Sequence, residues 1–254
     1  MKFSANLGFL WNDRPLPDAI RAAKAAGFHA VECHFPYDQD VNHVNAALVE
    51  TGLPMLGLNT SPGNMATGEF GRSSLPGREA DAQADINQAI GYAVAINCEN
   101  IHVLAGISQG CEAMAVFKAN LKYAYEKAAE HGINILIEPL NPRSNPGYFL
   151  NKSGMAADII ADLNLPNLKL MFDCYHIQMI ESNVTNRIKG LLPLIGHIQF
   201  AGVPDRHEPN TGELAYERLI PAIYEMGYDG YIGAEYRPRT TVEAGLDWLK
   251  NFSS

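Results

Sequence analysis

Short apolar runs alternate with longer segments of helical periodicity along almost the whole chain. Each run is rich in apolar residues and lies between turn-forming residues, which is the pattern of a strand. The pattern predicts eight strands, over Phe3–Leu7, Ala30–His34, Pro54–Asn59, Asn100–Ala105, Asn134–Leu140, Leu168–Tyr175, His197–Ala201 and Tyr231–Tyr236.

Segments with apolar residues at helical spacing, or with capping residues, lie between these strands. They predict helices over Asp18–Ala26, Asp81–Ala95, Glu112–Glu130, Ser153–Leu163, Tyr216–Met226 and Thr241–Lys250. Gly27, Gly132 and Gly227 follow three of these helices closely, and glycine is a common residue at a helix end.

Three segments share one order of elements, in which the end of a helix is followed by a glycine, a short loop, a strand and a Glu. They are AAGFHAVE, EHGINILIE and EMGYDGYIGAE. Strands that alternate with helices predict a parallel sheet, and eight such units predict a closed barrel. The 254 residues also match the ~250 of a typical barrel. We therefore expect an α/β fold in which residues 1–254 form a single (β/α)₈ TIM barrel domain. A doubly wound open sheet is the alternative, although no Gly-rich phosphate loop follows the first strand.

One long irregular segment, Thr60–Arg78, follows the third predicted strand. Loops longer than about 12–15 residues inside a compact domain are usually functional or disordered. We expect this loop to form a lid or a wall of a site.

The composition, with 47% hydrophobic and 19% charged residues, is ordinary for a globular protein. A net charge of -9 and the lack of a basic segment argue against nucleic acid as a partner. No apolar stretch approaches the ~20 residues of a membrane span, and the N-terminus lacks a signal-peptide pattern. The four cysteines form no CxxC pair, which disfavours a zinc knuckle or a redox motif. These features indicate a cytoplasmic protein with a small-molecule partner.

Polar residues end the last four predicted strands, where Glu138, Asp173, Gln199 and Glu235 stand in or just after apolar runs. The C-terminal ends of barrel strands meet at one rim, and a carboxylate buried there needs a partner. A single Glu in such a place is most simply a surface residue, but four together favour a shared metal ion. Their donors are all oxygen, which suits Mg²⁺ or Mn²⁺ better than Zn²⁺. If the hydroxyl and carbonyl oxygens of a substrate bound this metal, two flanking carboxylates could remove and return a proton on a substrate carbon.

The chain resembles the hydroxypyruvate isomerase family of the xylose isomerase-like barrels. The shared phrases run almost from end to end: FSANLGFL, VECHFPYD, LPGRE, LIEPLN, FDCYHIQ, GHIQFAGVPDRHEPNTGELAY and GAEYRPRTTVEAGLDW. The resemblance implies that Glu138, Asp173, Gln199 and Glu235 are metal ligands and that Glu138 and Glu235 are the catalytic acid/base pair. The 2-oxo-tetronate isomerases share these positions, and the segments VPDRHEP and LNTSPG resemble their sequences slightly more than those of the hydroxypyruvate isomerases.

The implied reaction interconverts hydroxypyruvate and 2-hydroxy-3-oxopropanoate, or 2-oxo-tetronate and 3-oxo-tetronate, through an enediolate. Both substrates are small hydroxy-oxo acids, so we expect a cation to meet their carboxylate. Arg206 and His207, which follow the seventh predicted strand, are the candidates for this contact, with Arg206 preferred. The expected substrate-binding residues are His176, Arg206, His102, Glu32 and Arg78. We expect His197 to lie in the core or next to the ligand residues and to orient Gln199. His34, His43 and His131 are interpreted as surface residues.

Three other functions stay open. A ketose epimerase would act on a neutral sugar, but such relatives usually have His where this chain has Gln199. A phosphodiester nuclease would need several zinc ions with many His ligands, which the eight His and the net charge of -9 disfavour. A sugar-acid binding protein would not need the acid/base pair. Barrels of this kind often associate, so a homo-oligomer is also open.

Overall fold

A computed structural model describes the protein over residues 1–252. Its strands form one eight-stranded parallel sheet in the order β2-β1-β8-β7-β6-β5-β4-β3. The strands are β1 (Phe3–Asn6), β2 (Ala30–Glu32), β3 (Gly57–Asn59), β4 (Asn100–His102), β5 (Asn134–Ile137), β6 (Leu168–Asp173), β7 (Ile195–Phe200) and β8 (Ile232–Ala234).

The two ends of the sheet, β2 and β3, meet and close the barrel. A parallel bridge pairs Val31 with Met55. The backbone N–H of Val31 donates to the carbonyl of Pro54 at 3.0 Å, and the N–H of Leu56 donates to the carbonyl of Val31 at 2.8 Å. Because all strands run parallel around this ring, their C-terminal ends share one rim. The predicted TIM barrel is therefore confirmed, and the open sheet is excluded.

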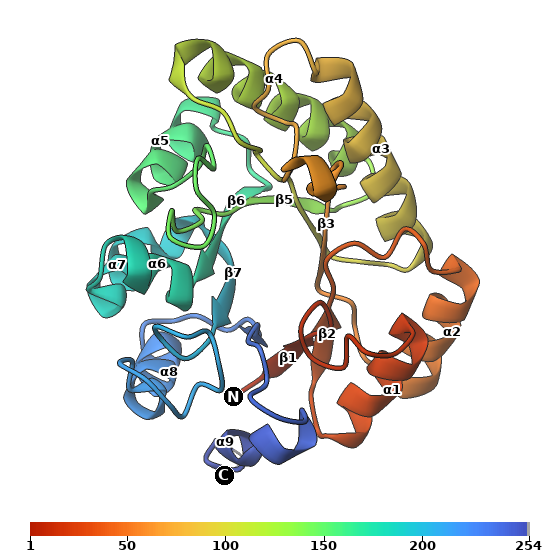
Figure 1. Ribbon diagram of the computed structural model, residues 1–254, viewed down its shortest axis with the longest axis vertical. Helices are drawn as coiled ribbons and strands as arrows, with labels where there is room; N and C mark the ends of the chain where they lie inside the picture. The colour runs from red at the N-terminus through yellow and green to blue at the C-terminus, as the bar shows by residue number, and fades with distance from the viewer. Residues whose placement is uncertain (253–254) are drawn as a thin grey trace.

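Helices surround the strands on the outside of the barrel (Figure 1). They are α1 (Leu16–Ala25), α2 (Val41–Thr51), α3 (Glu79–Ala95), α4 (Gly110–Ala129), α5 (Ser153–Leu163), α6 (Cys174–Ile180), α7 (Val184–Leu191), α8 (Tyr216–Glu225) and α9 (Asp247–Lys250). Short 3₁₀ turns occur at Met65–Thr67, Leu192–Leu194 and Glu243–Gly245. Among the described residues, no helix is both long and apolar enough to cross a bilayer.

The end of β6 differs from its prediction in a way that shapes the site. The apolar run predicts a strand that continues to Tyr175, but the strand ends at Asp173 and α6 begins at the next residue. The Asp173 carboxylate accepts a hydrogen bond from the backbone N–H of Tyr175 at 2.8 Å, so it caps the helix. This turn brings His176, one helical turn further on, back beside Asp173.

The long loop after β3 folds against the barrel rim. Arg72 pairs with Glu69 at 3.0 Å and with Asp85 at 2.9 Å, which ties the loop to α3. Met65 and Phe70 of this loop line a cavity at the rim. The expectation that this loop forms a wall of a site agrees with that placement.

Candidate active site

A cavity of about 300 Å³ lies over the C-terminal ends of the strands. Side chains from the strand ends and the loops that follow them line it, including His34, Asn59, His102, Glu138, His176, Arg206, Glu235 and Arg237. The placement of polar groups at the mouth of the barrel is the arrangement that TIM barrel enzymes use.

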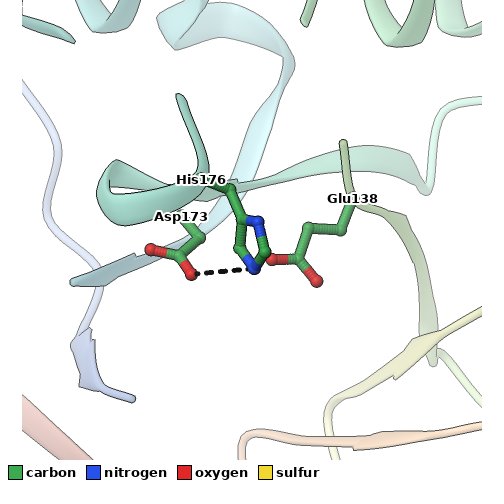
Figure 2. Close-up of side chains that lie close together, drawn as sticks. All are labelled: Glu138, Asp173 and His176. Carbon is green, nitrogen blue, oxygen red and sulfur yellow. Dashed lines mark ion pairs between the residues drawn. The ribbon is translucent and has the colours of Figure 1, made fainter. Parts of the chain in front are cut away.

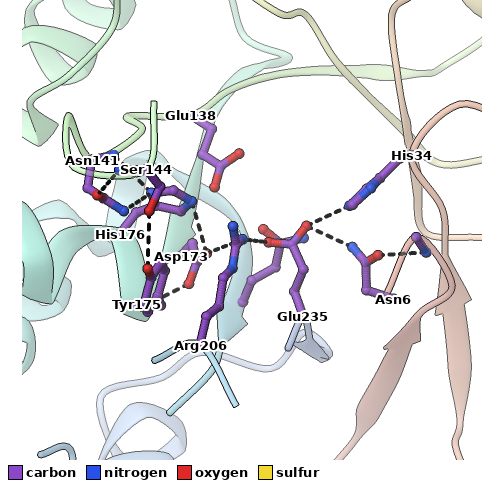
Figure 3. Close-up of polar contacts among 12 residues, drawn as sticks. Asn6, His34, Glu138, Asn141, Ser144, Asp173, Tyr175, His176, Arg206 and Glu235 are labelled. Atoms are coloured by element: carbon purple, nitrogen blue, oxygen red, sulfur yellow. Dashed lines mark hydrogen bonds and ion pairs between the residues drawn. The ribbon is translucent and has the colours of Figure 1, made fainter. Parts of the chain in front are cut away.

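Glu235 follows β8 and is surrounded by positive and hydrogen-donating groups (Figure 3). Its Oε1 accepts from Asn6 Nδ2 at 2.9 Å and lies 2.9 Å from His34 Nε2. Its Oε2 forms an ion pair with Arg206. Burial alone would raise the pKa of Glu235, but the Arg206 charge and the His34 hydrogen bond lower it to about 2. Glu235 is therefore an ionised carboxylate at neutral pH.

Glu138 follows β5 and has a different environment. Its Oε1 is buried and has no hydrogen-bond partner among residues 1–252. Its Oε2 lies 3.6 Å from His102 Nδ1. Burial, together with the charges of Glu235 and Asp173, raises the pKa of Glu138 well above 4.5. The neighbouring histidine adds no charge, because burial lowers the pKa of His102 to about 4.

Asp173 lies between Arg206 and His176. Its Oδ2 is 3.2 Å from the Arg206 guanidinium and 3.7 Å from His176 Nε2. Burial and the charge of Glu235 raise the pKa of Asp173 to about 7, although Arg206 acts in the opposite direction. Arg206 thus joins two acidic side chains, Asp173 and Glu235, within the buried site.

His176 is close enough to the acids to be considered as a metal ligand. The donor atoms of Glu138, Asp173 and His176 all lie within 4.8 Å of one another (Figure 2). However, the backbone N–H of Asn141 donates to His176 Nδ1 at 2.9 Å. Because burial lowers the pKa of His176 well below 6.5, its single ring proton must lie on Nε2. Nε2 is then a hydrogen-bond donor toward the cavity, not a free ligand atom.

Gln199, in β7, is hydrogen-bonded to Glu32. Its Nε2 donates to Glu32 Oε1 at 3.4 Å, and Glu32 Oε2 lies 2.6 Å from His197 Nε2. The Gln199 Oε1 atom is buried without a partner in the described part of the chain. Two unpartnered acceptor oxygens, on Gln199 and Glu138, are the donor chemistry that a hard cation needs. These two oxygens suit a divalent metal, although Glu235 is not in the group of side chains close enough to hold one, which among residues 1–252 comprises Glu138, Asp173 and His176.

The expected substrate-binding residues separate into two groups. His102, His176 and Arg206 line the cavity, as a role in binding requires. Glu32 is not among the lining residues, since its oxygens face His197 and Gln199. Arg78 is also absent from the lining, and it pairs with Glu69 and Asp81 on the surface.

His34 corrects one interpretation made from the sequence. Instead of lying on the surface, it lines the cavity and contacts Glu235. The available signal was its position two residues after Glu32, because alternate residues at a strand end share a side. His197, which we expected to orient Gln199, acts on it indirectly, because both side chains bind the Glu32 carboxylate.

Several known proteins are similar to this chain in sequence. The family model described as xylose isomerase-like TIM barrel matches residues 20–252. A 2-oxo-tetronate isomerase of Cupriavidus necator is 44% identical over 255 residues, which cover 99% of this chain and 98% of that protein. A Danio rerio protein named "Putative hydroxypyruvate isomerase" is 39% identical, with coverage of 99% and 95%.

Solved structures agree with the fold. A Brucella melitensis protein described as AP endonuclease, family 2, superposes with a TM-score of 0.96 at 37% identity, covering 100% of this chain and 99% of that one. The 3-keto-D-glucoside 4-epimerase of E. coli superposes with a TM-score of 0.82 at 21% identity, with 98% of both chains covered. The second likeness shows the same barrel and nothing further.

Proposed function

The chain belongs to the xylose isomerase-like TIM barrel family, and we propose that it is an isomerase of a small hydroxy-oxo acid, either hydroxypyruvate or 2-oxo-tetronate. Relatives with both names match over nearly their full length. The observation that carries the proposal is the pair Glu138 and Glu235, which line one cavity with their pKa values shifted in opposite directions. Such opposed shifts are typical of an acid and a base that act together.

The reaction moves one proton between neighbouring carbons. Glu235, ionised, takes the proton from the carbon that carries the hydroxyl group, and the electron pair of that bond forms the enediolate. Glu138 gives a proton to the adjacent former carbonyl carbon. The hydroxyl proton passes to the other oxygen, so the substrate and the product have the same atoms. Glu235 and Glu138 exchange roles in the reverse direction.

The neighbouring residues hold this pair in place. Asn6 and His34 fix one oxygen of Glu235, and Arg206 fixes the other. His176, with its proton on Nε2, can donate to a substrate oxygen. The Phe9 and Phe70 rings line the cavity and limit the access of water to the enediolate.

Glu138, Asp173, Gln199 and Glu235 are the residues that would hold a divalent cation, for which Mg²⁺ or Mn²⁺ is our proposal. The two unpartnered oxygens of Glu138 and Gln199 support this choice. When bound, such an ion polarises a carbonyl and stabilises the negative charge of an enediolate. Glu32 acts on the amide of Gln199, since its hydrogen bond turns the Gln199 oxygen away from Glu32.

A multi-zinc nuclease has weaker support. In the part of the chain that the structure describes, one group of three or more His, Cys, Asp or Glu side chains is close enough to hold a metal. The net charge of -9 also disfavours a polyanionic substrate.

A direct test uses the metal-stripped protein reloaded with Mg²⁺ or Mn²⁺ and assayed in heavy water with hydroxypyruvate and with 2-oxo-tetronate. We expect conversion of at least one acid, with solvent deuterium incorporated at the carbon that receives the proton. Conversion without deuterium would exclude proton exchange through the side-chain carboxyls and would favour a hydride shift. No conversion of either acid with either metal would refute the proposed activity.

A further inference from the structure

We propose that Arg237 binds the carboxylate of the substrate and thereby selects hydroxy-oxo acids over neutral sugars. This inference rests on the proposed function, because it assigns the acid-recognising part of the same cavity. The sequence points to Arg206 for that task, and the two arginines both line the cavity. Their surroundings decide between them.

Arg206 is already engaged by protein carboxylates. Its guanidinium pairs with Asp173 at 3.2 Å and also with Glu235. The rings of Phe9 and Tyr175 each lie 4.9 Å from its Cζ atom. A substrate carboxylate would therefore have to compete with two buried acids for a side chain that is fixed by stacking.

Arg237 is placed at the same cavity by the alternation of residues after β8. Glu235 faces the cavity, whereas the buried ring of Tyr236 lies elsewhere, with its hydroxyl accepting from Trp248 Nε1 at 3.1 Å. Arg237 again lines the cavity. Its backbone N–H donates to the Arg206 carbonyl at 2.8 Å, and its carbonyl accepts from His207 Nδ1 at 2.8 Å. The main chain is thus held while the side chain is exposed at the mouth.

The guanidinium of Arg237 is not neutralised by the protein. Within residues 1–252, no carboxylate oxygen lies within 4.0 Å of it. It lies 5.5 Å from the centre of the Phe9 ring, the same ring that Arg206 approaches. A planar guanidinium with free N–H groups is suited to a bidentate bond with a carboxylate.

The position of Arg237 also fits a substrate with an acid end. The carboxylate of Glu235, with Asp173 close to it across Arg206, would repel a carboxylate deep in the cavity, so the acid end is expected at the mouth. Arg237 lines both this cavity and an adjoining one of about 640 Å³ that also contains Arg14. A three- or four-carbon acid would fit with its reacting carbons near the two glutamates and its carboxylate toward the junction of these cavities.

The test compares Arg237→Gln and Arg237→Lys with wild type, all loaded with Mg²⁺. Hydroxypyruvate is the acid substrate, and dihydroxyacetone, in which a hydroxymethyl group replaces the carboxylate, is the neutral one. We expect Arg237→Gln to raise KM for hydroxypyruvate about 10- to 100-fold, with kcat reduced less than KM is raised. Arg237→Lys should lie between the two, and any turnover of dihydroxyacetone should not change.

The control variant is Arg143→Gln, which removes an exposed charge from the loop between β5 and α5. Ser144 and Asn145 of that loop line the cavity, but Arg143 does not. Its KM should equal that of wild type. An unchanged KM in Arg237→Gln, or an equal rise in Arg143→Gln, would overturn the proposal.

Binding measurements separate this proposal from the proposed activity. Calorimetric titration with D-glycerate, a carboxylate of the same size, requires no turnover. If wild type converts neither acid but binds glycerate at least 10-fold more tightly than Arg237→Gln does, the isomerase assignment fails and the carboxylate site stands. Equal affinity of the two proteins for glycerate, or no binding to wild type, removes the carboxylate site.

Discussion

At the scale of single residues, two glutamates differ because of their neighbours alone. Glu235 is bonded by Asn6, His34 and Arg206, all of which stabilise its charge. Glu138 has a buried oxygen without a partner in the described chain and faces a neutral histidine. The same side chain thus has a lowered pKa in one place and a raised pKa in the other, as the proposed base and acid require.

Replacement of either glutamate by glutamine should slow proton transfer strongly while the barrel stays folded. We expect Glu138→Gln and Glu235→Gln each to lower kcat by about 10²- to 10⁴-fold, the usual contribution of general acid/base groups. Their stabilities should differ. Glu235→Gln breaks a buried ion pair and should lower the free energy of unfolding by about 3 kcal/mol, whereas Glu138→Gln removes no ion pair with an arginine. Steady-state kinetics and urea unfolding test both statements, and near-wild-type kcat in either variant would contradict the acid/base assignment.

The sequence could identify acids at strand ends, but not the states that neighbours impose on them. Glu138, Asp173, Gln199 and Glu235 were recognisable because each polar residue interrupts or ends an apolar run. The His176 tautomer depends on a backbone N–H from another loop, and no pattern of residue types carries that information. Arg206 and Arg237 likewise look alike in sequence, since only coordinates show which of them is already paired.

At the scale of elements, the helix–glycine–strand units were predictable because their end signals are local. Helix α5 spans Ser153–Leu163 as predicted, and the glycines after α1, α4 and α8 take positive φ values of 91°, 70° and 101°. Helices α2, α6 and α7 were not predicted. Helix α2 has the sequence VNHVNAALVET, which is rich in β-branched and Asn residues with low helix propensity. Helix α6 has only seven residues and continues directly from a strand.

Two glycines provide a test of these end signals. Gly27, after α1, has φ +91° and open space where a Cβ atom would lie, so Gly27→Ala introduces backbone strain without a clash. We expect it to lower the free energy of unfolding by about 1 kcal/mol. Gly91 lies inside α3, and the space for a Cβ atom is also open there. Gly91→Ala should raise the free energy of unfolding by about 0.5–1 kcal/mol. Urea titrations of both variants would show equal effects if positive φ at Gly27 did not matter.

At the scale of the whole molecule, the barrel gathers three carboxylates, Glu138, Asp173 and Glu235, into one buried space. Eight local units predicted the closed sheet, and closure determines that the ends of β5, β6, β7 and β8 share a rim. What the sequence alone could not supply is the depth of burial. Glu138, Asp173 and Glu235 are all at least 94% buried. Because buried carboxylates close together repel one another, the net charge of the site depends on how the barrel packs around them.

This charge predicts how the stability of the metal-free protein depends on pH. The folded-state pKa of Asp173 is raised to about 7 and that of Glu138 is raised well above 4.5, so the folded protein binds more protons than the unfolded chain at mildly acidic pH. Stability from these groups is present below the unfolded pKa values and is lost as pH rises through the folded ones. Glu235, with a pKa of about 2, acts in the opposite direction, but its effect is confined to pH below about 4.5.

His102 and His176 oppose this effect, because burial lowers their pKa values and the stability that depends on them grows as pH rises toward 6.5. The prediction therefore concerns a difference between variants: from about pH 5 to pH 8, the Tm of the metal-free wild type should fall relative to that of metal-free Asp173→Asn. A divalent cation offsets the same negative charges, so Mg²⁺ should raise Tm more at pH 8 than at pH 5. At 100 times its Kd, the ion should add about 2.7 kcal/mol to the free energy of unfolding. Thermal melts at both pH values, with Mg²⁺ or with EDTA, measure both effects. A Tm difference between metal-free wild type and Asp173→Asn that is the same at pH 5 and pH 8, or an Mg²⁺ effect equal at the two pH values, would mean that these carboxyls do not share a buried, cation-dependent site.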